Sequence, residues 1–386
     1  MDGHILIKQG QIYNGIDEQP WVGDILVKDG KIEKLAEIIE GRIVNDAKII
    51  DATGLNVYPG FVEAHCHLGL DGYTGGLAEE DFNELNDCVT PQLSAVDGIN
   101  PMDITFQMAR EAGITCVCTG PGSSNVLGGT FCVLKTVGRR VDDMLVKEKA
   151  AMKCAFGENP KASYQEQSIS CRMTIAAKLR EMLQKAKVYE KERGPFDAKL
   201  EALLPVIRKE IPLKAHVHRA DDIFTAIRIA KEFDVKLTLD HCTEGHLIAE
   251  ELAKEGYSLA VGPSFGHASK KELEQKTFET PAILANAGCK VAIITDSPVV
   301  QEQYLTLSAA MAIQAGMTEH QALQAITIHA AEHIGAADRV GSIEVGKDAD
   351  IVIVDGSPFA TDIHICYTMI DGDVVYKNTS ERKCRI

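Results

Sequence analysis

The sequence lacks any apolar run near the roughly 20 residues that a membrane-spanning helix needs. Its first residues also lack the basic segment and long apolar core of a signal peptide, so we expect no secretory leader. Basic residues are in deficit, because 40 Lys and Arg stand against 56 Asp and Glu, which gives a formal charge of -16. We therefore expect no nucleic-acid partner and no membrane partner, and a small-molecule substrate instead.

The 11 cysteines lack the even number and regular spacing of a disulfide framework. Cys116 and Cys118 form a C-x-C pair that has neither zinc-ribbon nor thioredoxin spacing. Free thiols in a reducing cytoplasm are the expectation. No G-x-G-x-x-G follows the first strand of the body, which disfavours a dinucleotide-binding fold. The composition, with 45% apolar and 25% charged residues, is that of an ordinary soluble globular protein.

Short alternating runs near both ends of the chain read as β-strands. They predict one small β-sandwich domain formed by residues 1–58 and 345–386. Residues 59–344 alternate strands with helices, which is typical of an α/β fold of the (β/α)8 TIM barrel type; an open doubly wound sheet is the alternative. The eight predicted strands are at roughly 60–65, 114–119, 130–136, 150–155, 212–218, 235–241, 257–262 and 290–296. A charged amphipathic stretch at about 163–210 predicts a pair of helices outside the barrel.

The segment Tyr58–Gly69 enters from a Pro-Gly turn and ends in two histidines separated by one residue. Residues i and i+2 of a strand point to the same face, so His65 and His67 present two imidazoles together. Cys66 points to the other face, which argues against it as a ligand. An ordinary buried strand is the alternative for the pair alone. The pair lies where a strand meets a glycine-rich loop, however, and sites in parallel α/β folds are built there.

Charged or imidazole side chains end five of the eight predicted strands, and packing alone does not explain the whole set. Such strand ends supply the catalytic groups of α/β barrels, so they predict a divalent metal site. Zn2+ is the expected ion, although Mn, Fe and Ni also suit these ligands. A bound ion makes its water a nucleophile near neutral pH, and a carboxylate there can carry the proton to a departing nitrogen. The strand-end residues are His65 and His67, Lys153, His216 and His218, His241, and Asp296.

Several of these segments together resemble the metal-dependent amidohydrolase superfamily, closest to its imidazolonepropionase- and prolidase-like branch. They are PGFVEAHCHLG, the strand-end His216 and His241, TDSP around Asp296, and HAAEHIGAADRVGSIEVGKDADIVIVD. The resemblance extends from Gly3 to about Lys377. It implies a (β/α)8 barrel with a small β-sandwich, one or two metal ions, and a homo-oligomer. It also implies His65, His67, His216 and His241 as metal ligands, with Asp296 as a ligand and the catalytic proton shuttle.

The residue that would bridge two ions stays open between a lysine and a glutamate. The segment Met152–Ala155 resembles the carboxylated-lysine segment of isoaspartyl dipeptidases, with Lys153 as the modified residue. Burying an ammonium group is costly, and conversion to a carbamate would give that lysine a role. A lysine that extends to the rim is the structural alternative. Glu158 is the rival bridging ligand.

The substrate prediction rests on the residue three positions after the fifth-strand histidine. Deaminases of the superfamily usually have glutamate there, whereas this chain has Arg219, which disfavours deamination. We expect His218 and Arg219 at the cavity mouth, because arginine pairs bidentately with carboxylates. A salt bridge from Arg219 to Asp221 or Asp222 is the alternative. Asn125, in the glycine-rich loop 120–129, is a further candidate substrate contact.

These features predict a metal-dependent hydrolase that uses metal-activated hydroxide. It would cleave an amide or peptide C–N bond of a small carboxylate-bearing substrate, such as a dipeptide or an N-acyl amino acid. Opening of a cyclic amide, in the manner of imidazolonepropionase, is the alternative. Deamination and an inactive scaffold are the remaining ones.

Overall fold

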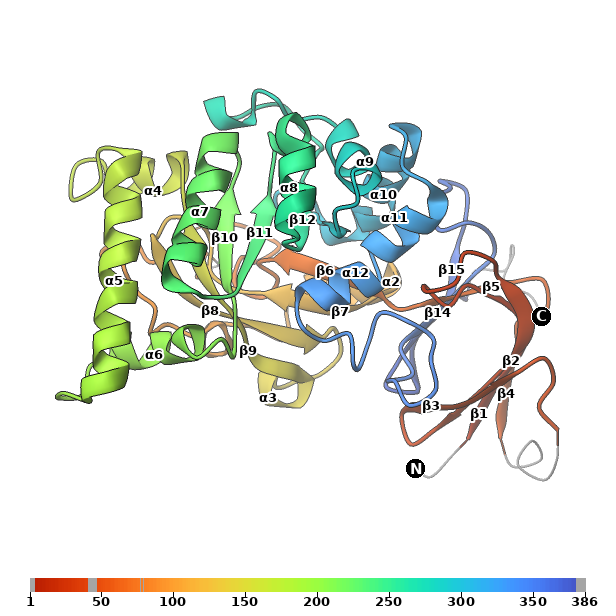
Figure 1. The fold of residues 1–386 in the computed structure, drawn as a ribbon. Helices are drawn as coiled ribbons and strands as arrows, with labels where there is room; N and C mark the ends of the chain where they lie inside the picture. Colours follow the sequence, from red (N-terminus) through yellow and green to blue (C-terminus); the bar gives the residue numbers. More distant parts are fainter. Residues whose placement is uncertain (1–3, 41–46, 77, 79, 380–386) are drawn as a thin grey trace.

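In a computed structural model, the chain forms two eight-stranded sheets, and most of the helices surround one of them (Figure 1). The structure describes residues 4–40, 47–76, 78 and 80–379. One sheet joins strands from both chain ends in the order β16-β15-β14-β5-β1-β2-β3, with β4 paired to β1. Its strands are β1 (Ile5–Ile12), β2 (Trp21–Lys28), β3 (Lys31–Ala36), β4 (Lys48–Asp51), β5 (Asn56–Pro59), β14 (Ile351–Val354), β15 (Ile365–Ile370) and β16 (Asp373–Lys377).

Strand β14 shows how this terminal sheet packs. Ile351 and Ile353 join a core within the terminal sheet, whereas Val352 and Val354 join the core of the other sheet. Alternate residues of a strand point to opposite faces, so one face of the terminal sheet packs against the body of the protein. A separate β-sandwich domain of residues 1–58 and 345–386, with a barrel at 59–344, stays a prediction. Residues 1–3, 41–46 and 380–386 lie outside the described part.

The other sheet, in the order β13-β12-β11-β10-β9-β8-β7-β6, is a nearly closed barrel. Its first and last strands, β6 and β13, approach each other just beyond their ends. There the backbone N–H of His67 donates to the carbonyl of Ser297 at 2.8 Å. The prediction of a TIM-like barrel is therefore confirmed at this level. Its strands are β6 (Phe61–Cys66), β7 (Ile114–Thr119), β8 (Leu127–Lys135), β9 (Leu145–Ala155), β10 (Leu213–Val217), β11 (Leu237–His241), β12 (Leu259–Val261) and β13 (Val291–Ile293).

The prediction of eight strand–helix alternations is wrong at β8, which runs antiparallel to both β7 and β9. Only residues 120–126 connect β7 to β8. A parallel crossover needs a dozen or more residues, usually including a helix, so this short connection returns the chain in the opposite direction. The other neighbouring strands of the barrel pair in parallel.

The helices cover the outside of the barrel and bury its strands on that side (Figure 1). The stretch predicted as a helix pair forms α5 (Arg172–Glu192) and α6 (Ala198–Ile207). No helix in the described part of the chain is long and apolar enough to cross a membrane. The remaining α-helices are α2 (Ile104–Glu111), α3 (Val141–Met144), α4 (Glu158–Ser163), α7 (Ala220–Phe233), α8 (Ala249–Glu255), α9 (Glu279–Asn286), α10 (Leu305–Gln314), α11 (Glu319–Ala325) and α12 (Ile328–His333).

Candidate metal centre

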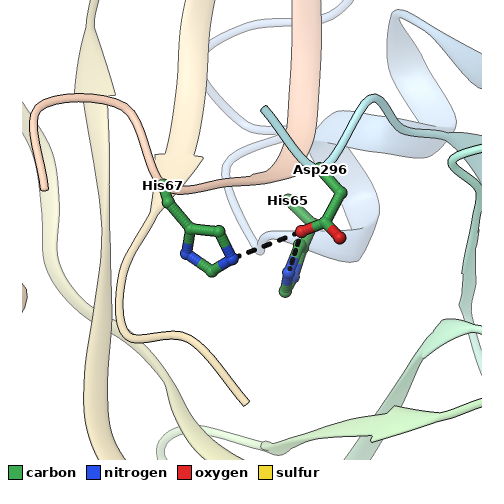
Figure 2. Close-up of side chains that lie close together, drawn as sticks. All are labelled: His65, His67 and Asp296. Carbon is green, nitrogen blue, oxygen red and sulfur yellow. Dashed lines mark ion pairs between the residues drawn. The ribbon is translucent and has the colours of Figure 1, made fainter. Parts of the chain in front are cut away.

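His65, His67 and Asp296 converge where β6 and β13 end (Figure 2). Oδ1 of Asp296 lies 3.2 Å from Nε2 of His65 and 3.3 Å from Nε2 of His67. Both imidazoles are buried, and the donor atoms of the three residues lie within 4.8 Å of one another. Two imidazoles and a carboxylate at this spacing are a set that can hold a divalent cation.

The other ring nitrogen of each histidine has its own partner. Nδ1 of His67 lies 2.7 Å from the carbonyl oxygen of Gly120, and Nδ1 of His65 lies 3.1 Å from Oδ2 of Asp240. Partners of this kind fix the orientation of a ligating imidazole and leave its second nitrogen free for a cation. The rings are therefore held with Nε2 directed at Asp296.

Asp296 has a left-handed backbone conformation, with φ at 53°. Thr295, the residue before Asp296, is held by Glu63. The carboxylate of Glu63 accepts hydrogen bonds from the backbone N–H of Thr295 at 2.9 Å and from its hydroxyl at 2.8 Å. Burial by itself would raise the pKa of Asp296. The imidazoles of His241, His65 and His67 around it instead hold that pKa well below its usual range. Asp296 is thus an ionised carboxylate at the floor of the site.

His216 and His241 lie beside this group, with ring centroids 4.5 Å apart, and His241 is 5.1 Å from His65 by the same measure. Burial lowers the pKa of His241 to about 3 and that of His216 well below its usual value. Neutral imidazole is the form that binds a cation. His218 and Glu272 form a second candidate group with His216, and its donor atoms also lie within 4.8 Å of one another.

Lys153 is fully buried at the end of β9, and its Nζ has no hydrogen-bond partner among the described residues. It lies 5.3 Å from the ring centroid of Phe131. Burial lowers its pKa to about 8. Glu158, the rival bridging residue, is engaged elsewhere, because its carboxylate accepts the backbone N–H of Glu272 at 3.0 Å.

The unsatisfied atoms of this region test whether a cation fits. Over the described residues, buried atoms without a hydrogen-bond partner include both ring nitrogens of His65, Oδ2 of Asp240, Nε2 of His216, Nζ of Lys153 and Oδ1 of Asp296. Buried polar atoms are nearly always hydrogen-bonded, so a cluster of such atoms indicates a missing partner. The imidazoles and the carboxylate of this set fit a divalent cation.

Sequence reasoning missed the buried ions behind His65. Asp240 pairs with Nδ1 of His65 through one oxygen and, through the other, lies 2.8 Å from Nζ of Lys214. Lys214 also donates to the carbonyl of Ala64 at 3.1 Å, and Nε2 of His333 lies 3.3 Å from Asp240. The sequence did contain a signal for this pair, because Lys214 and Asp240 each lie inside an apolar strand. Charged residues are rarely buried unless they are paired.

The structure does not bring two of the predicted substrate contacts into the site. Arg219 makes a bidentate salt bridge with Asp221, with both N···O distances at 2.9 Å, which was the alternative for this residue. Asn125 is buried, and its amide donates to the carbonyl of Asp87 at 2.7 Å. These partners already occupy the polar groups that were predicted to meet a substrate.

A cavity of about 570 Å3 opens above the candidate metal centre. His67, His216, His218 and Asp296 contribute to its wall. Pockets of this size hold small molecules. The site is therefore a concave one with its cation-binding groups at the base.

Residues 56–379 match the Amidohydrolase family. The chain belongs to this family. A solved amidohydrolase from Thermotoga maritima MSB8 is 40% identical, with a TM-score of 0.93 over 97% of this chain and 100% of that one. The imidazolonepropionase of Geobacillus sp. (strain WCH70) is 26% identical, with 92% of this amidohydrolase and 89% of that protein covered. Amidohydrolase tasK of Hapsidospora irregularis is 27% identical over 91% of this chain, which spans only 40% of the length of tasK.

These matches confirm the predicted superfamily and its imidazolonepropionase- and prolidase-like branch. They also confirm a hydrolase that acts on C–N bonds. Members of the family are generally metal-dependent, in agreement with the His and Asp groups of this amidohydrolase.

Proposed function

We propose that this amidohydrolase hydrolyses an amide or peptide C–N bond of a small carboxylate-bearing substrate, such as a dipeptide or an N-acyl amino acid, with a divalent metal ion. The observation that carries the proposal is the position of Asp296. Its carboxylate lies at the base of a cavity, within 3.3 Å of two imidazoles that are each held through their other nitrogen.

We propose His65, His67, His216, His241 and Asp296 as ligands, with Zn2+ as the ion. Lys153 is proposed as the bridging group of a two-metal site after carboxylation, because its amine is buried without a hydrogen-bond partner among the described residues. When bound, such an ion lowers the pKa of water toward neutrality and polarises a carbonyl group.

The protein's own contribution to the chemistry centres on one carboxylate. Asp296 is ionised and lines the cavity, so it can accept the proton of an attacking water. It can then deliver the proton to the leaving nitrogen, as general acid–base catalysis requires. Glu63 and the left-handed conformation of Asp296 fix the carboxylate in this position.

The size of the cavity supports a small substrate, and two lysines in its wall support one that carries a carboxylate. The side chains of Lys270 and Lys276 line it, and both lysines follow β12. Opening of a cyclic amide is a second candidate function, because imidazolonepropionases are relatives over 92% of this chain. A homo-oligomeric state and a cytoplasmic location stay predictions.

Product masses test the proposed reaction. The metal-loaded protein is incubated with pooled dipeptides, N-acyl amino acids and cyclic amides. Two fragments whose masses add up to substrate plus water are the expected result. A single product heavier by one water would establish ring opening instead, and release of ammonia would establish deamination. Absence of any product from pools that contain all three classes would contradict the proposal.

A further inference from the structure

The loop after β12 supplies the cations of the cavity wall. Residues 262–278 lie between β12 and α9, and both Lys270 and Lys276 of this loop line the cavity that contains Asp296. Arg219, the residue predicted to read a substrate carboxylate, is bound to Asp221 instead. A lysine can bind a substrate carboxylate there only if its charge is unpaired and one of its N–H groups is unused.

Lys276 has both. Its Nζ donates to the carbonyl oxygens of Phe265 at 2.7 Å and His267 at 3.2 Å. An ammonium has three protons, so these two bonds leave one N–H unused. Within the described part of the chain, no carboxylate forms an ion pair with Lys276. This includes Asp71 and Asp296, the two acidic residues that line the same cavity. Burial lowers the pKa of Lys276, and no neighbouring carboxylate offsets this effect.

Lys270 is committed within the protein. Its Nζ lies 2.7 Å from Oε1 of Glu272, and it donates to Oδ1 of Asn159 at 2.7 Å. Glu272 is buried and neutralises this charge locally. A substrate carboxylate at Lys270 would have to compete with an ion pair that already exists. The structure offers Lys276 without that competition.

We propose that Lys276 binds the carboxylate of the substrate and makes this amidohydrolase prefer a free acid over the corresponding neutral amide. The inference deepens the proposed function and rests on it for the bond that is cleaved. A partly buried ammonium with a free N–H gives a carboxylate a charge-assisted hydrogen bond. The two carbonyl groups of the loop hold the amine in place, so that little side-chain entropy is lost on binding.

Equilibrium binding measures this without turnover. N-methylsulfonyl amino acids, in which a sulfonamide replaces the scissile amide, and their C-terminal amides are titrated by calorimetry into the metal-loaded wild type and into Lys276→Met, Lys276→Arg, Lys270→Met and Lys271→Met. We expect the wild type to bind the acid roughly 10- to 100-fold more tightly than the amide, the range expected for a hydrogen bond to a charged group. The ratio should fall to near one in Lys276→Met and persist in Lys276→Arg, which keeps the charge.

Lys271→Met is the matched control from the same loop, because Lys271 pairs with Glu274 and its side chain is 71% exposed. It should retain the wild-type ratio. A change in loop structure alone would weaken acid and amide equally, and would leave the ratio unchanged. Equal binding of acid and amide by the wild type would overturn the inference, as would a ratio that survives in Lys276→Met or collapses in Lys270→Met instead.

The outcomes also separate this inference from the proposed function. If the wild type hydrolyses acids and amides equally well, C–N hydrolysis stands and the role of Lys276 fails. If acids bind in a Lys276-dependent way and no amide bond is cleaved, the binding role stands and the proposed reaction fails.

Discussion

Asp240 and His65 form a buried pair, with Oδ2 of the carboxylate 3.1 Å from Nδ1 of the imidazole. Burial by itself would raise the pKa of Asp240, but Lys214 and His65 hold it well below its usual range. An ionised carboxylate behind the ring favours the tautomer with hydrogen on Nδ1. Nε2 then faces Asp296 with its lone pair, in the orientation that a metal ligand requires.

Asp240→Asn should therefore destabilise the protein. It leaves the buried Lys214 ammonium without its counter-ion, and breaking a buried pair from one side costs about 3–5 kcal/mol. Urea unfolding of the metal-free protein measures the change. The double variant Asp240→Asn/Lys214→Met removes both charges and should recover much of the loss. A single variant as stable as the wild type would show that the pair contributes nothing.

Lys153→Met should stabilise the metal-free protein at neutral pH. A tenfold change in protonation equilibrium corresponds to about 1.4 kcal/mol, so a pKa lowered from 10.5 to about 8 corresponds to a penalty of about 3 kcal/mol. Below pH 8 the amine is charged in both states, and this penalty is fully present. Between pH 8 and 10.5 the folded protein releases the proton that the unfolded chain retains, so the penalty disappears as pH rises. Unfolding curves at pH 7 and 9.5 should show a gain that shrinks at the higher pH.

The same lysine should be needed for activity. Lys153→Ala should lose turnover, and short carboxylates such as formate or acetate should restore part of it by taking the place of a carbamate. Glu158→Ala is the comparison, because the Glu158 carboxylate accepts the backbone N–H of Glu272 in the structure. It should retain its metal. Greater loss of metal from Glu158→Ala than from Lys153→Ala would assign the bridge to Glu158.

His67→Ala should lose metal and activity together and remain folded. The ring is at the cavity wall, where Nδ1 contacts Gly120 and Nε2 contacts Asp296, so its removal opens no large hole in the core. Circular dichroism checks the fold, and elemental analysis checks the metal content. Wild-type metal content with wild-type turnover would remove His67 from the site.

The convergence of His65, His67 and Asp296 followed from local rules, because strand alternation and the strand-end position of barrel sites suffice to place them. The reversed direction of β8 depends on the short connection from β7. The pattern of apolar residues within a strand does not indicate the direction in which the strand runs. Arg219 was expected at the cavity mouth from its position after the fifth strand and from its match to a carboxylate, whereas Asp221, two residues away, binds the guanidinium. Lys276 lies in an irregular loop, where no periodicity marks which side chains face a cavity.

The central claim is that hydrolysis depends on a cation held by His65, His67 and Asp296. The most direct measurement is turnover against bound metal, with chelator-treated protein and stepwise addition of Zn2+, for the wild type and His65→Ala. The substrate is whichever compound of the pools the wild type cleaves. We predict that turnover disappears with the metal, returns in proportion to bound Zn2+, and stays absent in a folded His65→Ala protein. Full turnover by the metal-free wild type, or by His65→Ala, would contradict the account.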